Sequence, residues 1–369
     1  MLDVKDIRSA VDAVIEPQLV RSLGELGFVR TVRANSDATT VQLALPTMEW
    51  PNLEGLTATI EAIDSSVHVE VFPMSEDERL ALRHFLRTSM TSDADESSHS
   101  NDAKPRFMER SSRTRVLGIS SGKGGVGKST VTVNLAISLA QRGLDVGVLD
   151  ADVYGFSLPK MLGASHDPII LGDTVIPTLA HGVRCLSMGY FVPDEQPVIW
   201  RGPMLHKAIE QLVTEAWWDE PDFLLIDMPP GTGDVALTLS EVIPRIEMYV
   251  VTTPQAAAQR VAQRSAYAAR KLKLSVRGVI ENMSYFTGDD GTRYEIFGSG
   301  GGQSLASELG LALLSQIPLD PTLREGGDIG RPVVVDHPDS EVSRVFGLLA
   351  DRIIAQGPAR VYRQELKLV

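Results

Sequence analysis

The stretch "RVLGISSGKGGVGKST", residues 115–130, decides the fold of this chain of 369 residues. It opens with an aliphatic run of the kind found in buried strands, passes through a glycine-rich turn and enters a segment with helical spacing of apolar residues. Within it, Gly122, Gly127, Lys128 and Ser129 satisfy the pattern G-x-x-x-x-G-K-[ST]. The stretch therefore predicts a strand, a phosphate-binding loop and a helix in succession.

Each residue type in this loop has a physical reason to be there. Glycines let backbone N–H groups approach phosphate oxygens without an intervening side chain, and the helix N-terminus adds partial positive charge. Lys128 would neutralise charge on the β- and γ-phosphates, and the Ser129 hydroxyl would bind Mg²⁺. The residues expected to contact the nucleotide are Gly122, Lys123, Gly124, Gly125, Val126, Gly127, Lys128, Ser129 and Thr130. The alternative, a glycine-rich turn with a chance lysine, is disfavoured because strand, loop and helix are in register.

Two further strand ends carry carboxylates. "VGVLDADVYG" places Asp150 and Asp152 after the next strand, and "FLLIDMPPGTGD" places Asp227 after an aliphatic run. Asp227 occupies the place where a carboxylate on the Mg²⁺ side usually lies. Each carboxylate alone could be an acidic cap of a strand end. Together with the loop, the two motifs predict a switch that responds to the γ-phosphate.

From residue 115 onward, strand patterns alternate with helix patterns. The predicted strands are "RVLGIS", "DVGVLD", "VRCLSM", "FLLID", "MYVVTT" and "VRGVIEN", with helices at about 128–142, 204–217, 235–244 and 255–273. Near-continuous aliphatic strands separated by helices predict a parallel sheet buried on both faces, so the fold class is a doubly wound, mainly parallel α/β P-loop NTPase domain. Before it, shorter helix and strand patterns predict a small α+β domain.

The predicted domains follow from these patterns. They are a small α+β domain at 1–87, a flexible linker at 88–114, the P-loop domain at 115–356 and a C-terminal tail at 357–369. The linker is predicted because "TSMTSDADESSHSNDAKPR" is rich in Ser, Asp and Asn and almost lacks large apolar residues. We also expect Trp217 and Trp218 to end a helix packed on the sheet, and "EGGDIGRPV" (325–333) to turn the chain into a last strand.

The composition is that of an ordinary globular protein, with 43% hydrophobic and 22% charged residues. The net charge of −13 argues against nucleic-acid binding and stable membrane association, which need a basic face. The N-terminus lacks the pattern of a signal peptide, and no apolar run reaches the roughly 18 residues of a membrane span. The single cysteine, Cys185, allows no intramolecular disulfide and fits a reducing compartment. These observations predict a cytoplasmic protein.

Several motifs together resemble one family. "GKGGVGKST", with its early lysine, is similar to the deviant Walker A loop of MinD, ParA and the nitrogenase iron protein. "DADVYG", "WRGPM", "DMPPGTGD", "ENMSYF" and "GSGGG" add a resemblance to the Mrp-type, or ApbC-type, iron–sulfur cluster carrier ATPases over residues 105–356. The resemblance implies a homodimer that hydrolyses ATP with Mg²⁺ and serves apo iron–sulfur proteins or cluster assembly factors. It leaves open a bound [4Fe-4S] cluster.

The resemblance also implies roles for individual residues. Lys123 would reach across the dimer to the ATP held by the other subunit and, with Lys128, stabilise the charge that develops during phosphoryl transfer. Asp152 would orient or activate the attacking water, which makes Lys123, Lys128 and Asp152 the implied catalytic set. Asn282 in "ENMS" would recognise adenine, because a carboxamide offers both a donor and an acceptor. The alternatives are a solvated loop lysine for Lys123 and strand-end capping for Asn282.

The sequence departs from this family at the cluster site. Many Mrp-type proteins carry C-x-x-C between "ENMS" and "FG", whereas this chain has Thr287 and Asp290 near the two cysteine places. A dimer would supply only two copies of Cys185, which is predicted to be a buried strand residue. The seven histidines show no metal-binding spacing. The iron–sulfur ligands are therefore unknown, and Asp289 and Asp290 are predicted to form a turn with their flanking glycines.

The first 87 residues resemble the small PaaD-like domain that is often fused to these ATPases. The stretch "VIEPQLVRSLGELGFV" is similar to the opening signature of that domain. Its functional cysteine normally precedes a proline, and Trp50 before Pro51 occupies the matching place here. A cluster role for this domain is therefore not supported by the residue that stands there.

Three functions remain open at this point. They are an ATPase that carries or helps assemble iron–sulfur clusters, a MinD- or ParA-like positioning switch gated by nucleotide, and a cluster-free adaptor ATPase for client proteins. The C-terminal "PARVYRQELKLV" is the segment that would serve the switch as a membrane-targeting helix. Pro358 ahead of it and Glu365 within it favour a frayed tail instead.

Overall fold

The computed structural model describes residues 3–35, 38–90, 105–109, 111–153, 155–191, 202–231, 234–243 and 245–359. Most of the predicted linker and of the predicted tail lies outside these residues. The chain divides into two compact units. The first comprises Met1–Arg106, His166–Leu179 and Glu215–Asp219, and the second comprises Phe107–Ser165, Ala180–Thr214 and Glu220–Val369.

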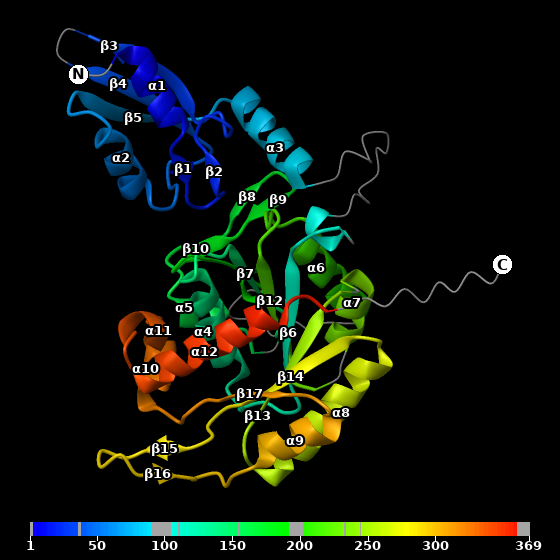
Figure 1. Ribbon diagram of the computed structural model, residues 1–369. Coiled ribbons are helices and arrows are strands. Elements are labelled where there is room, and N and C mark those ends of the chain that lie inside the picture. The colour runs from blue at the N-terminus through cyan, green and yellow to red at the C-terminus, as the bar shows by residue number, and fades with distance from the viewer. Residues whose placement is uncertain are drawn as a thin grey trace. The chain divides into compact units, whose positions relative to one another are not determined.

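The second unit is built on an eight-stranded sheet (Figure 1). In order across the sheet, its strands are β10 (Thr178–Ala180), β11 (Val183–Ser187), β7 (Val146–Asp150), β12 (Phe223–Asp227), β6 (Arg115–Ser121), β13 (Glu247–Thr252), β14 (Ser275–Glu281) and β17 (Leu313–Gln316). The strands from β11 to β17 pair in parallel, and every residue of β7, β12, β6 and β13 is buried. The predicted doubly wound α/β fold is confirmed. Because parallel strands end at the same edge, the loops that follow β6, β7 and β12 meet there.

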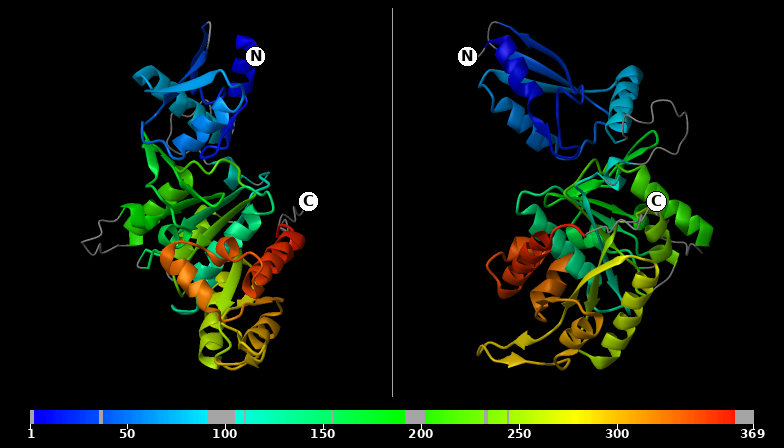
Figure 2. Two further views of the ribbon diagram at one scale, coloured as in Figure 1. Left: turned by 90° about the vertical axis from the view of Figure 1, so that its left-hand side faces the viewer. Right: turned by 45° about the vertical axis from the view of Figure 1, so that its right-hand side comes forward.

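Helices cover both faces of this sheet (Figures 1 and 2). One face carries α4 (Lys128–Ala140), α5 (Leu158–Leu162), α10 (Pro321–Ile329), α11 (Val333–Asp336) and α12 (Glu341–Gln356), and the other carries α6 (Gly202–Thr214), α7 (Asp234–Val242), α8 (Ala256–Lys271) and α9 (Gly301–Leu309). Apolar residues of α4 and α12 share one large core with the sheet, while α8 and α9 form a smaller core with β13 and β14. Of the helices in the described residues, none is long and apolar enough to cross a membrane.

The first unit has its own three-stranded sheet in the order β3–β4–β5. Its elements are α1 (Val4–Asp12), β1 (Ile15–Glu16), β2 (Arg21–Ser22), β3 (Val29–Ala34), β4 (Thr39–Leu45), α2 (Leu53–Glu61), β5 (Val67–Pro73), α3 (Glu76–Met90), β8 (Ile169–Leu171) and β9 (Thr174–Ile176). β3 and β4 pair antiparallel, and β4 and β5 pair in parallel. Phe28 and Trp50 meet edge to face in its core, with ring centroids 5.5 Å apart. This is the small α+β architecture that the sequence predicts.

Two segments that follow the glycine-rich loop in the sequence, His166–Leu179 and Glu215–Asp219, pack in the first unit. The sequence places Trp217 and Trp218 at the end of a helix on the large sheet, but α6 ends before them. Trp217 is instead fully buried in the core of the first unit, and its Nε1 donates to the backbone oxygen of Leu19 at 3.2 Å. The β8–β9 hairpin joins the same unit, where Asp173 pairs with Arg83 of α3 at 2.8 Å. The two tryptophans are therefore buried residues that follow α6, and they are not part of a helix packed on the large sheet.

The segment 325–333 ends one helix and leads into another, whereas the sequence predicts that it leads into a last strand. α10 runs to Ile329 and α11 follows, while the last strand of the sheet, β17, precedes both. Asp320 begins α10 by accepting the backbone N–H of Thr322 at 2.8 Å. The glycines of this segment serve close packing, because a Cβ on Gly326 would lie 2.4 Å from a backbone oxygen.

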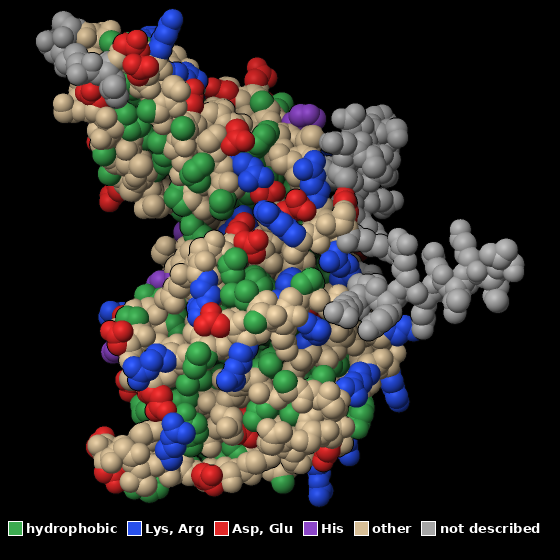
Figure 3. Space-filling view, viewed as in Figure 1, with side chains coloured by type: hydrophobic (Ala, Val, Ile, Leu, Met, Phe, Trp, Pro, Cys, Tyr) green, Lys and Arg blue, Asp and Glu red, His purple; other side chains and the backbone are tan. Residues whose placement is uncertain are grey.

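Charged side chains of both signs are interspersed over the face seen in Figure 3, without one extended basic field there. Many of them pair, as Arg30 does with Glu78 and Arg142 does with Asp351, at 2.6 and 2.5 Å. Such exposed pairs contribute only about 0–1 kcal/mol each. They matter here because they distribute the net charge of −13 rather than concentrate it.

Candidate functional site

The glycine-rich loop between β6 and α4 adopts a backbone that only its glycines allow. Gly125 and Gly127 both have a φ of +78°, in the left-handed region. Gly122 lies against α8, and a Cβ there would be 2.3 Å from backbone atoms of Val261 and Ala262. The loop therefore exposes backbone rather than side chains in front of the helix N-terminus, as phosphate binding requires.

Lys128, the first residue of α4, lies between carboxylates from two neighbouring strands. Its Nζ is 2.7 Å from Oδ2 of Asp227 and 3.7 Å from Oδ2 of Asp152. The side chain is 7% exposed, so its charge is shielded from bulk water and its ion pairs are stronger than those at the surface. The structure thus brings together three residues that the sequence places far apart in the chain.

Asp227 is the centre of a network of oxygen atoms. The Ser129 hydroxyl donates to its Oδ2 at 2.6 Å, and the Thr132 hydroxyl donates to its Oδ1 at 2.8 Å. Hydroxyl and carboxylate oxygens are the hard ligands that Mg²⁺ prefers, so the donor set fits this ion. Sequence reasoning missed Thr132. Its place three residues after Ser129, on the same face of α4, was the signal that could have found it.

Asp150 ends β7 directly opposite Asp227 in the register of the sheet. It is fully buried, and its carboxylate accepts the backbone N–H groups of Asp152, Ser157 and Leu158 at 3.2, 2.8 and 3.1 Å. Burial, followed by the charge of Asp227, raises the pKa of Asp150 to about 7. Asp152, which follows it by two residues, is the carboxylate that faces Lys128.

Lys123 lies at the start of the loop, half-buried, with its Nζ 3.3 Å from Oε1 of Gln255. The Ser121 hydroxyl donates to the Lys123 backbone oxygen at 3.0 Å, which orders this end of the loop. The next two residues, Gly124 and Gly125, are exposed. Lys123 thus sits at the open edge of the loop, while Lys128 is enclosed behind it.

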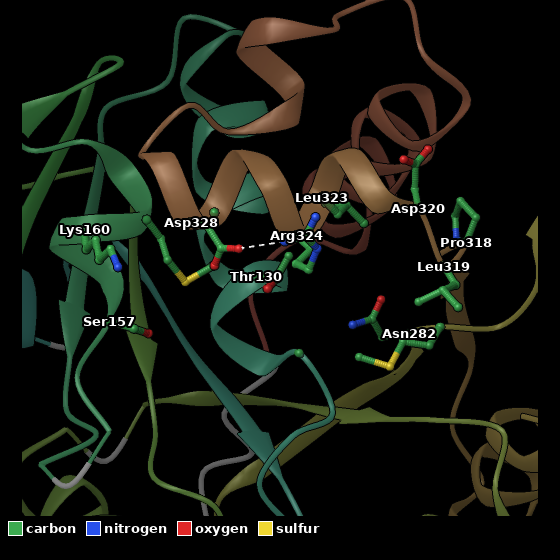
Figure 4. A pocket seen from close by; sticks show the side chains of 14 residues that line it. Thr130, Ser157, Lys160, Asn282, Pro318, Leu319, Asp320, Leu323, Arg324 and Asp328 are labelled. Atoms are coloured by element: carbon green, nitrogen blue, oxygen red, sulfur yellow. Dashed lines mark hydrogen bonds and ion pairs between the residues drawn. The ribbon is translucent and has the colours of Figure 1, made fainter.

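A cavity of about 380 Å³ adjoins the loop. Its lining residues include Gly127, Thr130, Ser157, Lys160, Asn282, Pro318, Leu319, Leu323 and Arg324. Figure 4 shows the Asn282 carboxamide directed toward this cavity from the end of β14. Its Nδ2 donates to the backbone oxygen of Val126 at 2.9 Å, so the side chain is tied to the loop. The cavity is of a size that suits a nucleoside, and its lining combines apolar side chains with the Asn282 carboxamide, two hydroxyls and charged side chains of both signs.

A model of the ParA group described as the NUBPL iron-transfer P-loop NTPases matches residues 112–354. The chain belongs to this family. An iron–sulfur cluster carrier protein from Mycobacterium tuberculosis is 41% identical over 358 residues, which are 94% of this chain and 91% of the relative. The predicted resemblance to the cluster carrier ATPases is therefore confirmed.

Two solved structures share the fold of this iron-transfer P-loop NTPase. A nucleotide-binding protein from Archaeoglobus fulgidus in complex with ADP is 31% identical, and the match covers 63% of this chain and 93% of that one with a TM-score of 0.54. The septum site-determining protein MinD from Pyrococcus horikoshii, complexed with Mg-ADP, is 26% identical, with coverage of 67% and 100% and a TM-score of 0.52. The matched share corresponds to the size of the second unit.

The hairpin at residues 286–294, where the resemblance to the cluster carriers implies a C-x-x-C motif, contains no cysteine. It consists of β15 (Phe286–Thr287) and β16 (Arg293–Tyr294). Asp290 accepts the backbone N–H and the hydroxyl of Thr292 at 2.9 and 2.8 Å, which confirms the turn predicted there. Both oxygens of Asp290 are thus engaged within the turn. Among the described residues, no three His, Cys, Asp or Glu side chains gather as metal ligands would.

Cys185 lies in the middle of β11 and is fully buried, as predicted. Burial raises the pKa of its thiol well above the ordinary value, and the charge of Asp150 adds to this effect. A thiol that stays protonated inside the sheet is a poor ligand for iron. In this iron-transfer P-loop NTPase, Cys185 is therefore a small apolar core residue.

Proposed function

We propose that this chain is a homodimeric ATPase that carries or helps assemble iron–sulfur clusters for apo-proteins. The convergence of Lys128, Ser129, Asp152 and Asp227 at one end of the sheet, in a chain of the iron-transfer family, carries this proposal. The relative from M. tuberculosis, matched over nearly its whole length, is named an iron–sulfur cluster carrier protein.

ATP would bind with its phosphates in the loop. The loop backbone and the Lys128 ammonium supply the donors, and phosphate oxygens would compete with Asp227 for that ammonium. Ser129 and Asp227 would hold Mg²⁺, which supplies charge neutralisation on the phosphates when bound. Asp152 would orient the attacking water, since its carboxylate lies 3.7 Å from the Lys128 ammonium at the phosphate end of the sheet.

Lys123 would complete the site of the other subunit. Its place at the exposed edge of the loop supports this role, because an enclosed lysine could not reach a second chain. Among the described residues, a 3.3 Å hydrogen bond to the neutral Gln255 side chain holds the ammonium, and a bond with one charged partner contributes about 1.5–3 kcal/mol. The lysine can therefore leave Gln255 for the more highly charged phosphates of a partner's ATP.

The base would occupy the cavity beside Asn282. One N–H of Nδ2 of Asn282 donates to Val126, which orients the carboxamide and leaves Oδ1 as the acceptor that can meet an amino group of the base. Adenine presents an amino donor at the place where guanine presents a carbonyl acceptor. We infer that this orientation of the carboxamide selects ATP over GTP.

The thiolates for a cluster would come from outside the chain. Its one cysteine is buried in β11, so even a dimer offers no exposed thiol from this residue. A cluster would then be held by a client protein, an assembly factor or a small thiol while the ATPase cycle controls the complex. This inference agrees with the occupied oxygens of Asp290 at the hairpin tip.

A second candidate is an adaptor ATPase that binds clients and no cluster. It is favoured by the way the hairpin is fastened to α12. Glu341 accepts hydrogen bonds from Tyr285, Thr287 and Arg293 at 3.1, 3.2 and 3.0 Å, and Arg293 stacks over Tyr285 at 4.1 Å. These bonds would hold the hairpin as a fixed protein surface without any metal. The predicted MinD- or ParA-like switch rests on a tail that lies outside the described residues.

We infer that the protein acts in the cytoplasm on protein partners. The net charge of −13 and the single cysteine support this assignment, and they argue against nucleic-acid partners and stable membrane association.

Cluster transfer tests the proposal. The chain is incubated with iron, sulfide and a small thiol without oxygen, and activation of an apo [4Fe-4S] enzyme is followed with and without ATP. We expect faster activation with the chain than without it, dependent on ATP, and lost in Lys128→Ala. Activation at the same rate without the chain would refute the carrier role. ATP-dependent capture of metal-free clients in that case would support the adaptor.

A further inference from the structure

We propose that Asp150 is the positioning residue that fixes Asp152 for phosphoryl transfer, an inference that rests on the ATPase activity proposed above. The family resemblance implies a catalytic role for Asp152 and attaches none to Asp150 by itself. Yet Asp150 is the more enclosed of the two, with 0% of its surface exposed. A carboxylate in that position needs donors on every side, and the structure supplies them.

Both oxygens of Asp150 are occupied by donors from this chain. Oδ1 accepts the backbone N–H of Asp152 at 3.2 Å. Oδ2 accepts the backbone N–H groups of Ser157 and Leu158 at 2.8 and 3.1 Å, and the Ser187 hydroxyl of β11 lies 3.3 Å away. A carboxylate accepts about four hydrogen bonds, and four donors of this chain approach this one. Three of them are backbone N–H groups, so the side chain acts as a tether for backbone.

The Asp150 side chain binds both ends of the segment that follows β7. Asp152 begins the segment and Ser157 and Leu158 end it, and all three bind the same side chain. The Asp152 carboxylate, 3.7 Å from the Lys128 ammonium, is thereby held at the phosphate end of the sheet. A displacement of about 1 Å at a catalytic group can cost about 100-fold in rate, so this tether acts on the chemical step.

The two carboxylate oxygens of Asp150 bind different backbone groups, so one substitution can separate their effects. Asp150→Asn keeps the size of the side chain and one acceptor oxygen. That oxygen is best used on Ser157 and Leu158, which leaves the new amide group facing the N–H of Asp152. Two donors then face each other, and the bond to Asp152 is lost while the end of the segment stays capped. The variant loosens Asp152 alone.

The test measures kcat and KM for ATP, the Kd for ADP and hydrogen–deuterium exchange of the backbone from 151 to 160. In Asp150→Asn we expect kcat to fall about 10- to 100-fold, the Kd for ADP to change less than about 3-fold, and exchange to rise at Asp152 but not at Leu158. The matched control is Asp222→Asn, because Asp222 also accepts a backbone N–H, that of Asp145 at 3.0 Å, at the opposite end of the sheet. It should leave all these values unchanged.

Two results overturn the proposal. One is an unchanged kcat in Asp150→Asn. The other is a loss of ADP affinity as large as the loss of kcat, because Asp150 would then support the fold of the site and not the chemical step. The exchange measurement needs no turnover, so it keeps this inference separate from the proposed function. If the natural chain hydrolysed no ATP, the ATPase proposal would fail, and unchanged exchange at Asp152 in Asp150→Asn would show that the tether fails too.

Discussion

Replacing Gly122 by alanine should damage the nucleotide site through α8. The added Cβ would lie 2.3 Å from backbone atoms of Val261 and Ala262, whereas carbon atoms in ordinary contact are about 3.5–4.0 Å apart. The loop and the helix would have to separate by more than about 1 Å. Neither can rotate out of the way as a side chain could, because the close atoms belong to the backbone. Overpacking of this kind typically costs about 1–3 kcal/mol.

This strain can lower either the free energy of unfolding or the affinity for ADP, and both can be measured. If the fold absorbs it, the free energy of unfolding of the second unit falls by about 1–3 kcal/mol. If the loop yields instead, ADP binds about 5- to 150-fold more weakly, because each 1.4 kcal/mol is a factor of ten in affinity. Denaturant unfolding and titration with a fluorescent ADP, both on the full chain, measure the two effects.

The matched control is Gly347→Ala in α12. A Cβ there meets only Nη2 of the flexible Arg142 side chain, at 3.4 Å. It should be neutral or slightly stabilising, because alanine is a better helix former than glycine. Equal behaviour of Gly122→Ala and Gly347→Ala in both assays would refute the close-packing argument.

Three further outcomes are expected. Lys123→Ala should lower the ATP hydrolysis rate at least about 10-fold with little change in the Kd for ADP, because in the proposed dimer it would remove a charge used only in the transition state of the other subunit; an equal loss of ADP affinity would show that it acts within its own site. Asn282→Ala should narrow the preference for ADP over GDP, measured as the ratio of their Kd values, by about 10-fold or more, since a missing hydrogen bond costs about 1–3 kcal/mol; an unchanged ratio would remove Asn282 from base selection. Burial raises the pKa of Glu16, so the stability that this group adds to the first unit is fully present below its unfolded pKa and is lost as the pH rises through its folded pKa. The free energy of unfolding should therefore fall less between pH 4 and pH 7 in Glu16→Gln than in the natural chain, and an identical pH dependence would contradict this.

The phosphate end of the site could be predicted from the sequence because its residues are consecutive. Residues 115–130 determine a strand, a loop and a helix by local rules, and the parallel sheet follows from aliphatic strands separated by helices. Asp150 was predicted only as one of the strand-end carboxylates, and Thr132 was not recognised, because their roles depend on which backbone groups and carboxylates approach them in three dimensions. Their partners lie up to 95 residues away in the chain.

The sequence also could not predict which segments of the chain make up the first unit. Trp217 follows a helix of the second unit, and only its burial against Leu19 reveals where it belongs. The prediction for the segment 325–333 was wrong for a different reason. Its glycines look like turn residues, but in α10 they permit a close approach to the backbone of Arg331. Both cases depend on contacts between distant parts of the chain, which local patterns do not contain.

The most direct test of a homodimeric ATPase is to mix two variants that are each inactive alone. Lys123→Ala lacks the lysine that we propose is given to the other subunit, and Asp152→Ala lacks the carboxylate that we propose orients the water. In a mixed dimer, the site on the Lys123→Ala chain has its own Asp152 and receives Lys123 from the other subunit. With random pairing, the account predicts recovery of about a quarter of the natural ATP hydrolysis rate. A mixture as inactive as its components would contradict the account, because Lys123 would then serve only its own chain.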